Sequence, residues 1–66
     1  MQIILNGEST TVDANTTIAQ LIEQLQLTGK RIAVEINEEI MPRSAHATTP
    51  LREGDKVEIV HAIGGG

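Results

Sequence analysis

One stretch of sequence decides the fold, Thr17-Ile18-Ala19-Gln20-Leu21-Ile22-Glu23-Gln24-Leu25. Its large apolar residues recur at i, i+3, i+4 and i+7, which places them on one face of an α-helix. They are Ile18, Leu21, Ile22 and Leu25. Thr17 and Gln20 fit a capping box, in which each side chain bonds a free backbone N–H of the first turn. Gly29 is the expected stop, because glycine adopts the left-handed conformation at a helix end without strain.

Strand patterns surround this helix on both sides. Before it, two β-rich runs flank Asn6-Gly7, the dipeptide that best accepts the positive φ values of a two-residue hairpin turn. After it, Pro42 places a short strand at a sheet edge or ends it, because proline cannot donate to the ladder. The predicted strands are residues 1–5, 8–12, 32–36, 40–41 and 56–63. Residues 43–49 are expected to be irregular. One helix covers one face of one sheet, so the predicted fold class is α+β.

Alternation along the strands assigns residues to the two faces of this sheet. The residues expected to face the helix are Met1, Ile3, Leu5, Val57, Ile59 and His61. Those expected on the open face are Gln2, Ile4, Ala33, Glu58, Val60 and Ala62. Clustered apolar residues there would form a docking patch, whereas scattered ones are ordinary for a protein surface. The sequence leaves both interpretations open.

Composition excludes several classes of protein. A chain of 66 residues has room for one small core. It has no Cys, which excludes disulfides, zinc-thiolate sites and a thiol nucleophile, and no Phe, Tyr or Trp, which excludes base stacking. A net charge of −4 makes nucleic acid and anionic membranes poor partners, and no run approaches the roughly 20 apolar residues of a membrane span. The expectation is a soluble, cytoplasmic protein that binds neither nucleic acid nor membrane.

The titratable residues do not form a recognisable site. His46 and His61 lack the short-spaced partners of a metal centre, so we expect no metal. His46 is predicted to be an exposed loop residue, and His61 to cap the end of the core. The paired carboxylates, at Glu38-Glu39 and in Glu53-Gly54-Asp55, lie in predicted turns, where acidic residues are common. The chain therefore has no predicted catalytic residues of its own.

The run Gly64-Gly65-Gly66 is the most informative feature, and it has two interpretations. The first is a frayed tail or a cloning remnant. The second is a functional terminus, because a glycine carboxylate has no flanking Cβ and is sterically accessible. An α-carboxyl group has a pKa of about 3.3–3.7 and is ionised at neutral pH, so it is a competent nucleophile toward an activated phosphate.

The whole chain resembles the ThiS family of thiamine-biosynthesis sulfur carriers. The resemblance rests on the order and spacing of residues 1–7, 17–22, 32–37 and 40–43, the Leu51-x-x-Gly54-Asp55 turn and the Ala62-Ile63-Gly64-Gly65-Gly66 end. It implies the β-grasp, or ubiquitin-like, fold, with a mixed sheet of four to five strands on one helix. The first and last strands would then lie parallel at the centre, joined by a right-handed crossover. Residues 1–63 would form the domain and residues 64–66 a flexible tail.

The resemblance also implies a function. The Gly66 carboxylate would be adenylated with ATP by a ubiquitin-activating-like (ThiF-type) adenylyltransferase and converted to a thiocarboxylate. The sulfur would come indirectly from a cysteine desulfurase or another persulfide source, and would pass to a ThiG-type thiazole synthase. The chain would be a protein co-substrate with no bound cofactor. Gly64 and Gly65 would thread the partner's channel. The docking candidates are Ile4, Val60, Ala62 and Ile63.

Two other interpretations stay open at this point. The first is a sulfur carrier like the small subunit of molybdopterin synthase, which also ends in Gly-Gly but is usually longer and carries aromatic residues. The second is a β-grasp binding module whose terminal glycines are inert.

Overall fold

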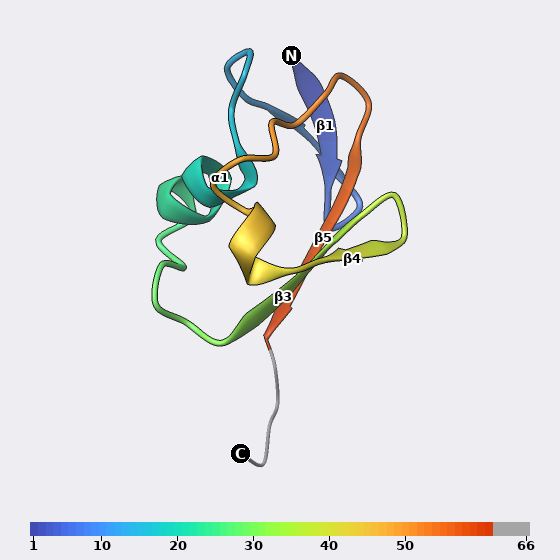
Figure 1. Ribbon diagram of the computed structural model, residues 1–66. Coiled ribbons are helices and arrows are strands. Elements are labelled where there is room, and N and C mark those ends of the chain that lie inside the picture. The colour runs from blue at the N-terminus through green and yellow to red at the C-terminus, as the bar shows by residue number, and fades with distance from the viewer. Residues whose placement is uncertain (62–66) are drawn as a thin grey trace.

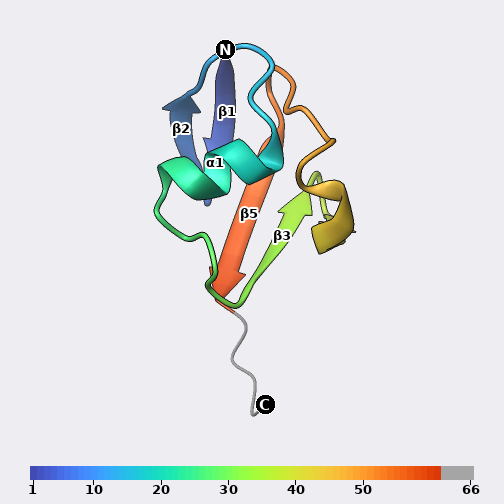
Figure 2. The same cartoon turned by 60° about the vertical axis from the view of Figure 1, so that its left-hand side comes forward.

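The computed structural model describes residues 1–61, which form a five-stranded mixed sheet with one α-helix packed on one face (Figures 1 and 2). The elements in chain order are β1 (Gln2–Leu5), β2 (Glu8–Thr11), α1 (Ile18–Gln24), β3 (Ile32–Ile36), β4 (Glu39–Met41), the 3₁₀ helix η1 (Arg43–Ala45) and β5 (Lys56–His61). The strand order is β2-β1-β5-β3-β4. β1 and β5 are parallel and the other neighbours are antiparallel. The α+β class and the β-grasp arrangement are confirmed.

Two tight turns set the register of the two hairpins. Asn6 and Gly7 join β1 to β2 with φ values of 48° and 85°, and Asn37 and Glu38 join β3 to β4 with φ values of 50° and 72°. Positive φ at both central residues is the type I′ geometry, whose twist matches that of the flanking strands. The first hairpin turn is as predicted. The second is one residue shorter than predicted, because Glu39 already belongs to β4.

The backbone N–H groups at the start of α1 all have hydrogen-bond acceptors. The predicted capping box is present: the Gln20 N–H donates to Thr17 Oγ1 at 3.1 Å, and the Thr17 N–H donates to Gln20 Oε1 at 2.9 Å. The Ile18 N–H donates to the Thr49 carbonyl at 3.1 Å, and the Ala19 N–H to the His46 carbonyl at 2.9 Å. These donors have no partner within a helix, so the segment after η1 completes the helix start.

The end of α1 differs from the prediction. The helix stops at Gln24, and Gln26, with φ 61°, is the left-handed residue that ends it, whereas Gly29, with φ 82°, lies in the turn that follows. The Leu27 N–H donates to the Ile22 carbonyl at 2.9 Å, and the Gln26 N–H to the Glu23 carbonyl at 3.0 Å. This pair of bonds is the Schellman motif, which reverses the chain and brings Leu27 back toward the core.

Leu25 was expected on the buried stripe, and that expectation is wrong. Its side chain is 37% exposed, because the Schellman turn ends the helix there and Leu27 packs against the core instead. The other three residues of the stripe are buried, as predicted.

The core is aliphatic and lies between α1 and the helix-facing side of the sheet. Its buried members are Ile3, Val12, Ile18, Leu21, Ile22, Val34, Leu51, Val57 and Ile59. The strand residues among them have the predicted alternation, since Ile3, Val57 and Ile59 face the helix. Among residues 1–61, no helix is long and apolar enough to cross a membrane.

Candidate functional site

The last strand, β5, is the central strand of the sheet and leads to the glycine run. It pairs in parallel with β1 and antiparallel with β3 over five residue pairs, ending at His61 opposite Ile32. This end of β5 lies at the opposite end of the molecule from the N-terminus (Figures 1 and 2). Ala62, Ile63, Gly64, Gly65 and Gly66 lie outside the described residues. The described part of the site is therefore the base from which the terminal residues extend.

The asparagines of the two hairpin turns hold β5 from both sides. The Asn6 N–H donates to the Val57 carbonyl at 2.8 Å, and Asn6 Oδ1 accepts from the Ile59 N–H at 2.8 Å. On the other side, the Asn37 N–H donates to the Lys56 carbonyl at 2.8 Å, and Asn37 Oδ1 accepts from the Lys56 N–H at 3.0 Å. The strand is thus bonded to both turns as well as to both neighbouring strands, and the base of the tail is firmly held.

The predicted docking residues that the structure describes lie on the open face. Ile4 is 36% exposed and Val60 is 53% exposed. They are not neighbours, because Ile4 pairs with Lys56, four residues before Val60, which is roughly 13 Å along the strand. Val60 instead lies opposite Ala33 of β3. The docking role of these residues stays a prediction.

A further exposed apolar residue on the open face was missed in the sequence. Ile40 of β4 is 72% exposed and lies opposite Glu35 of β3. Glu35 in turn lies opposite Glu58 of β5. The open face next to the end of β5 therefore combines apolar side chains with two directly opposed carboxylates. The register that brings them together is a tertiary property, and the local pattern of each strand does not contain it.

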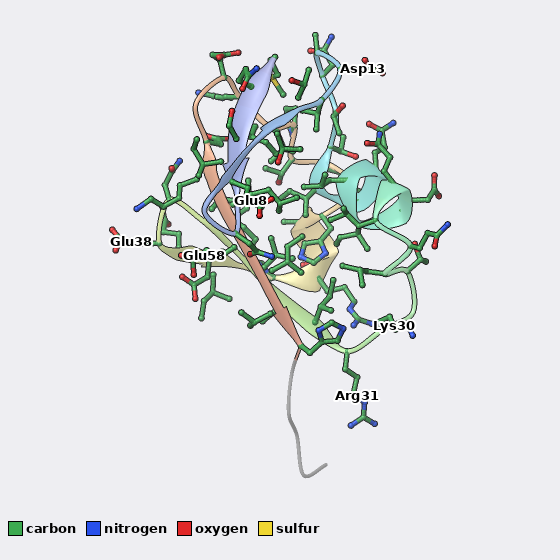
Figure 3. All side chains as sticks on the ribbon, turned by 180° about the vertical axis from the view of Figure 1, so that it is seen from behind. Glu8, Asp13, Lys30, Arg31, Glu38 and Glu58 are labelled. Carbon is green, nitrogen blue, oxygen red and sulfur yellow. The ribbon has the colours of Figure 1, made fainter. Side chains whose placement is uncertain are left out.

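Four of the charged residues labelled in Figure 3 lie on different sides of the sheet. Glu58 and Glu38 are on the side of the sheet away from α1, whereas Lys30 and Arg31 lie on the helix side, near the end of β5 (Figure 3). On the open face, β3 and β5 carry Glu35 and Glu58, and Lys56 lies two residues before Glu58.

The two histidines are not placed as predicted. His46 is 9% exposed rather than an open loop residue, because η1 turns residues 43–49 back onto the start of α1. Its ring Nε2 lies 3.1 Å from the Met41 carbonyl oxygen, within hydrogen-bond distance. His61 does not cap the core, because its side chain is exposed. Within residues 1–61, no three His, Asp or Glu side chains are grouped as a metal site would require.

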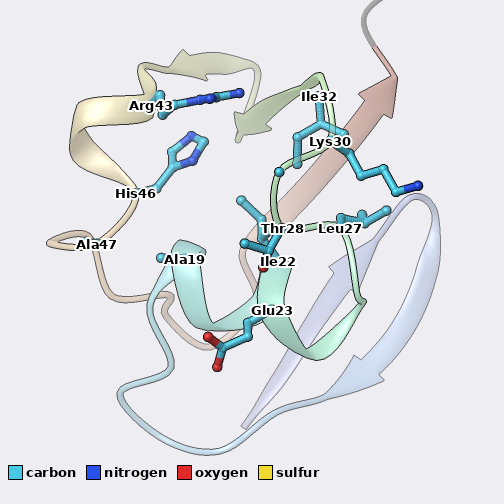
Figure 4. A pocket seen from close by; sticks show the side chains of 11 residues that line it. Ala19, Ile22, Glu23, Leu27, Thr28, Lys30, Ile32, Arg43, His46 and Ala47 are labelled. Carbon is cyan, nitrogen blue, oxygen red and sulfur yellow. The ribbon is translucent and has the colours of Figure 1, made fainter.

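A hollow of about 340 Å³ lies on the helix side, between α1, the loop that follows it and η1 (Figure 4). Its apolar lining includes Ala19, Ile22, Leu27 and Ile32, and Arg43 lies beside His46 at one end (Figure 4). The hollow is open to solvent, and its polar lining consists of single charged side chains, Glu23, Lys30 and Arg43, together with His46.

Comparison with known proteins places the chain in a family. The sequence model of the ThiS family matches residues 3–66. The chain belongs to the ThiS family. The sulfur carrier protein ThiS of Escherichia coli strain K12 is 33% identical over 66 residues, and the match covers 100% of both chains. A crystal structure of a thiamine biosynthesis protein (ThiS) from Geobacter metallireducens superposes with a TM-score of 0.84, at 32% identity and with 100% of both chains covered.

Longer proteins also contain a ThiS-like segment. Thiazole synthase of Paramagnetospirillum magneticum is 41% identical to this chain over 66 residues. The match covers 100% of this chain but only 20% of that protein. This chain therefore spans about a fifth of the length of the first two curated relatives that it matches.

Proposed function

We propose that this chain is a sulfur carrier protein of thiamine biosynthesis that carries sulfur as a thiocarboxylate on Gly66. The observation that carries the proposal is the full-length match to a family with a curated member of the same length named sulfur carrier protein. The match extends through Gly66. The proposal takes residues 1–63 as the folded domain and residues 64–66 as its tail.

The proposed chemistry begins by activating a poor electrophile. An oxygen of the Gly66 carboxylate attacks the α-phosphorus of ATP, the bond to the β-phosphate breaks, and pyrophosphate leaves. The terminal sulfur of a protein persulfide then attacks the carbonyl carbon of the acyl-adenylate, and AMP leaves. A second thiol of the partner then attacks the cysteine sulfur of the resulting acyl disulfide. The bond between the two sulfurs breaks, the thiocarboxylate leaves, and a disulfide remains on the partner. Each step needs a catalytic group or thiol that this chain, which has no Cys, leaves to its partners.

The proposed partners follow from this sequence of steps. They are an adenylyltransferase of the ThiF type, a persulfide source such as a cysteine desulfurase, and a thiazole synthase that accepts the sulfur. The thiazole synthases with a ThiS-like segment support the last of these. The chain is then a regenerated co-substrate in the cytoplasm that binds no cofactor itself. ATP and the sulfur donor are bound by its partners.

The chain itself contributes an accessible C-terminal carboxylate, which follows a strand that the fold holds in place. Asn6 and Asn37 accept hydrogen bonds from β5 on its two sides. A partner that binds the domain therefore also fixes the position from which the tail extends. Gly64 and Gly65 then thread the partner's channel, because residues without a Cβ fit where others clash. We propose that the residues that dock on the partner include Ile4, Val60, Ala62 and Ile63.

The threading proposal is tested by ATP–pyrophosphate exchange with the cognate adenylyltransferase. Gly65→Val, or one residue appended after Gly66, is expected to abolish exchange while the urea unfolding curve stays unchanged. Ala14→Val is the control, because it places the same β-branched side chain at an exposed turn residue away from β5. Normal exchange with the Gly65→Val chain contradicts the proposal.

A further inference from the structure

The open face beside the end of β5 has no covering element among the described residues. α1 packs on the opposite face of the sheet (Figure 2). On the open face, Val60 lies opposite Ala33, one residue before the strand ends at His61. The exposed Ile40 lies on the same face, one strand further out. This apolar surface, made of Ala33, Ile40 and Val60, is continuous with the base of the tail, and we call it the β5 patch.

Two carboxylates interrupt the β5 patch, and their arrangement is unfavourable for the isolated domain. Glu58 and Glu35 are directly opposed across the antiparallel pair of β5 and β3. Like charges in directly opposed positions destabilise a sheet. The nearest cation of β5 on this face, Lys56, lies two residues before Glu58, about 7 Å along the strand. A neutral or basic residue at either position would give a more stable sheet.

The surroundings of this pair indicate what would compensate for the repulsion. Ile40 flanks Glu35 on the β4 side, and Val60 follows Glu58 two residues later on the same face. A cation placed between the two carboxylates would be bordered by apolar side chains, where reduced access of water strengthens charge interactions. The β5 patch is therefore suited to a partner surface that presents a Lys or Arg among apolar residues.

We propose that the β5 patch is the docking surface for the adenylating partner, and that Glu35 and Glu58 together receive a Lys or Arg from it. The inference rests on the proposed function, because that partner must hold the tail carboxylate against ATP. A protein that binds a triphosphate concentrates positive charge near its site, which complements an acidic surface at the base of the tail. The basic residues near the end of β5, Lys30 and Arg31, lie on the other side of the sheet (Figure 3).

The proposal predicts that stability and docking change in opposite directions. Glu35→Lys places a cation opposite Glu58, so it is expected to raise the urea midpoint of unfolding. The same change removes the pair that receives the partner's cation. In ATP–pyrophosphate exchange with the carrier as varied substrate, the KM is expected to rise by about tenfold or more with an unchanged kcat, since only binding is lost. Glu58→Gln is expected to raise KM in the same direction.

The matched control is Glu23→Lys, which makes the same change in net charge at an exposed position of α1. Its KM is expected to stay within about twofold of the original chain's, because long-range charge alone is screened at physiological salt. The original chain's KM is expected to rise with salt, and that of the Glu35→Lys chain to depend on salt less steeply.

The outcomes separate this inference from the function on which it rests. If the original chain supports no exchange with an active adenylyltransferase, the proposed function fails. If it supports exchange and Glu35→Lys has the same KM as Glu23→Lys, only the docking inference is overturned. The inference is also overturned if Glu35→Lys leaves exchange unchanged and reduces sulfur transfer to thiazole synthase, because the β5 patch would then belong to that partner.

Discussion

Truncating Leu21 and Leu25 tests how α1 is held in place. Both leucines belong to the apolar stripe of the sequence, and they lie one helical turn apart. Leu21 is 2% exposed and belongs to the core, whereas Leu25 is 37% exposed at the C-cap. The structure therefore predicts very different costs for the same chemical change.

Leu21→Ala is expected to lower the free energy of unfolding by about 2–5 kcal/mol, which combines lost burial with the cavity left behind. A chain of 66 residues has a total of roughly 3–10 kcal/mol, so this is a large fraction of its stability. Leu25→Ala is expected to cost about 1 kcal/mol or less, as for partly exposed positions. Urea unfolding with an unchanged slope gives both values. Equal losses for the two variants, or a larger loss for Leu25→Ala, would refute this description of the helix.

Two further predictions concern local backbone geometry. Gln26→Gly is expected to stabilise the chain by about 0.5–1 kcal/mol in urea unfolding, because glycine removes the strain of the left-handed residue at the helix end. Gln24→Gly, at the last residue of α1, is expected to destabilise the chain by up to about as much, and stabilisation by both or by neither would contradict the assignment. Asn6→Gly keeps the turn but removes the acceptor of the Ile59 N–H, so faster hydrogen exchange is expected at that amide. Asn6→Asp keeps an acceptor and is expected to preserve the protection, and equal exchange in the two variants would show that the side-chain bond is unimportant.

Much of the fold could be predicted because its signals are local. The Asn6-Gly7 turn, the capping box of Thr17 and Gln20 and the alternation in β5 all depend on residues within a few positions of one another. The end of the helix was mispredicted for a physical reason. Glycine is the least strained residue in the left-handed conformation, but Gln26 adopts it at the helix end, because the turn there packs the half-buried Leu27 against the core.

The features missed in the site depend on contacts between distant segments. The bond from the Ile59 N–H to Asn6 Oδ1 spans 53 residues, and no local pattern indicates it. Likewise, His46 is buried because residues 43–49 fold back onto the helix start, where its carbonyl accepts from the Ala19 N–H. Glu35, Glu58 and Ile40 come together only through the register of β3 with its two neighbours.

The central claim is that Gly66 carries sulfur, and the most direct test is the intact mass of the chain after reaction. The chain is incubated with the cognate adenylyltransferase, ATP and a persulfide source, and omission of ATP is the control. The account predicts the mass gain of one oxygen replaced by sulfur, localised to the C-terminal fragment and absent without ATP. An unchanged mass, with an adenylyltransferase verified as active, would contradict it.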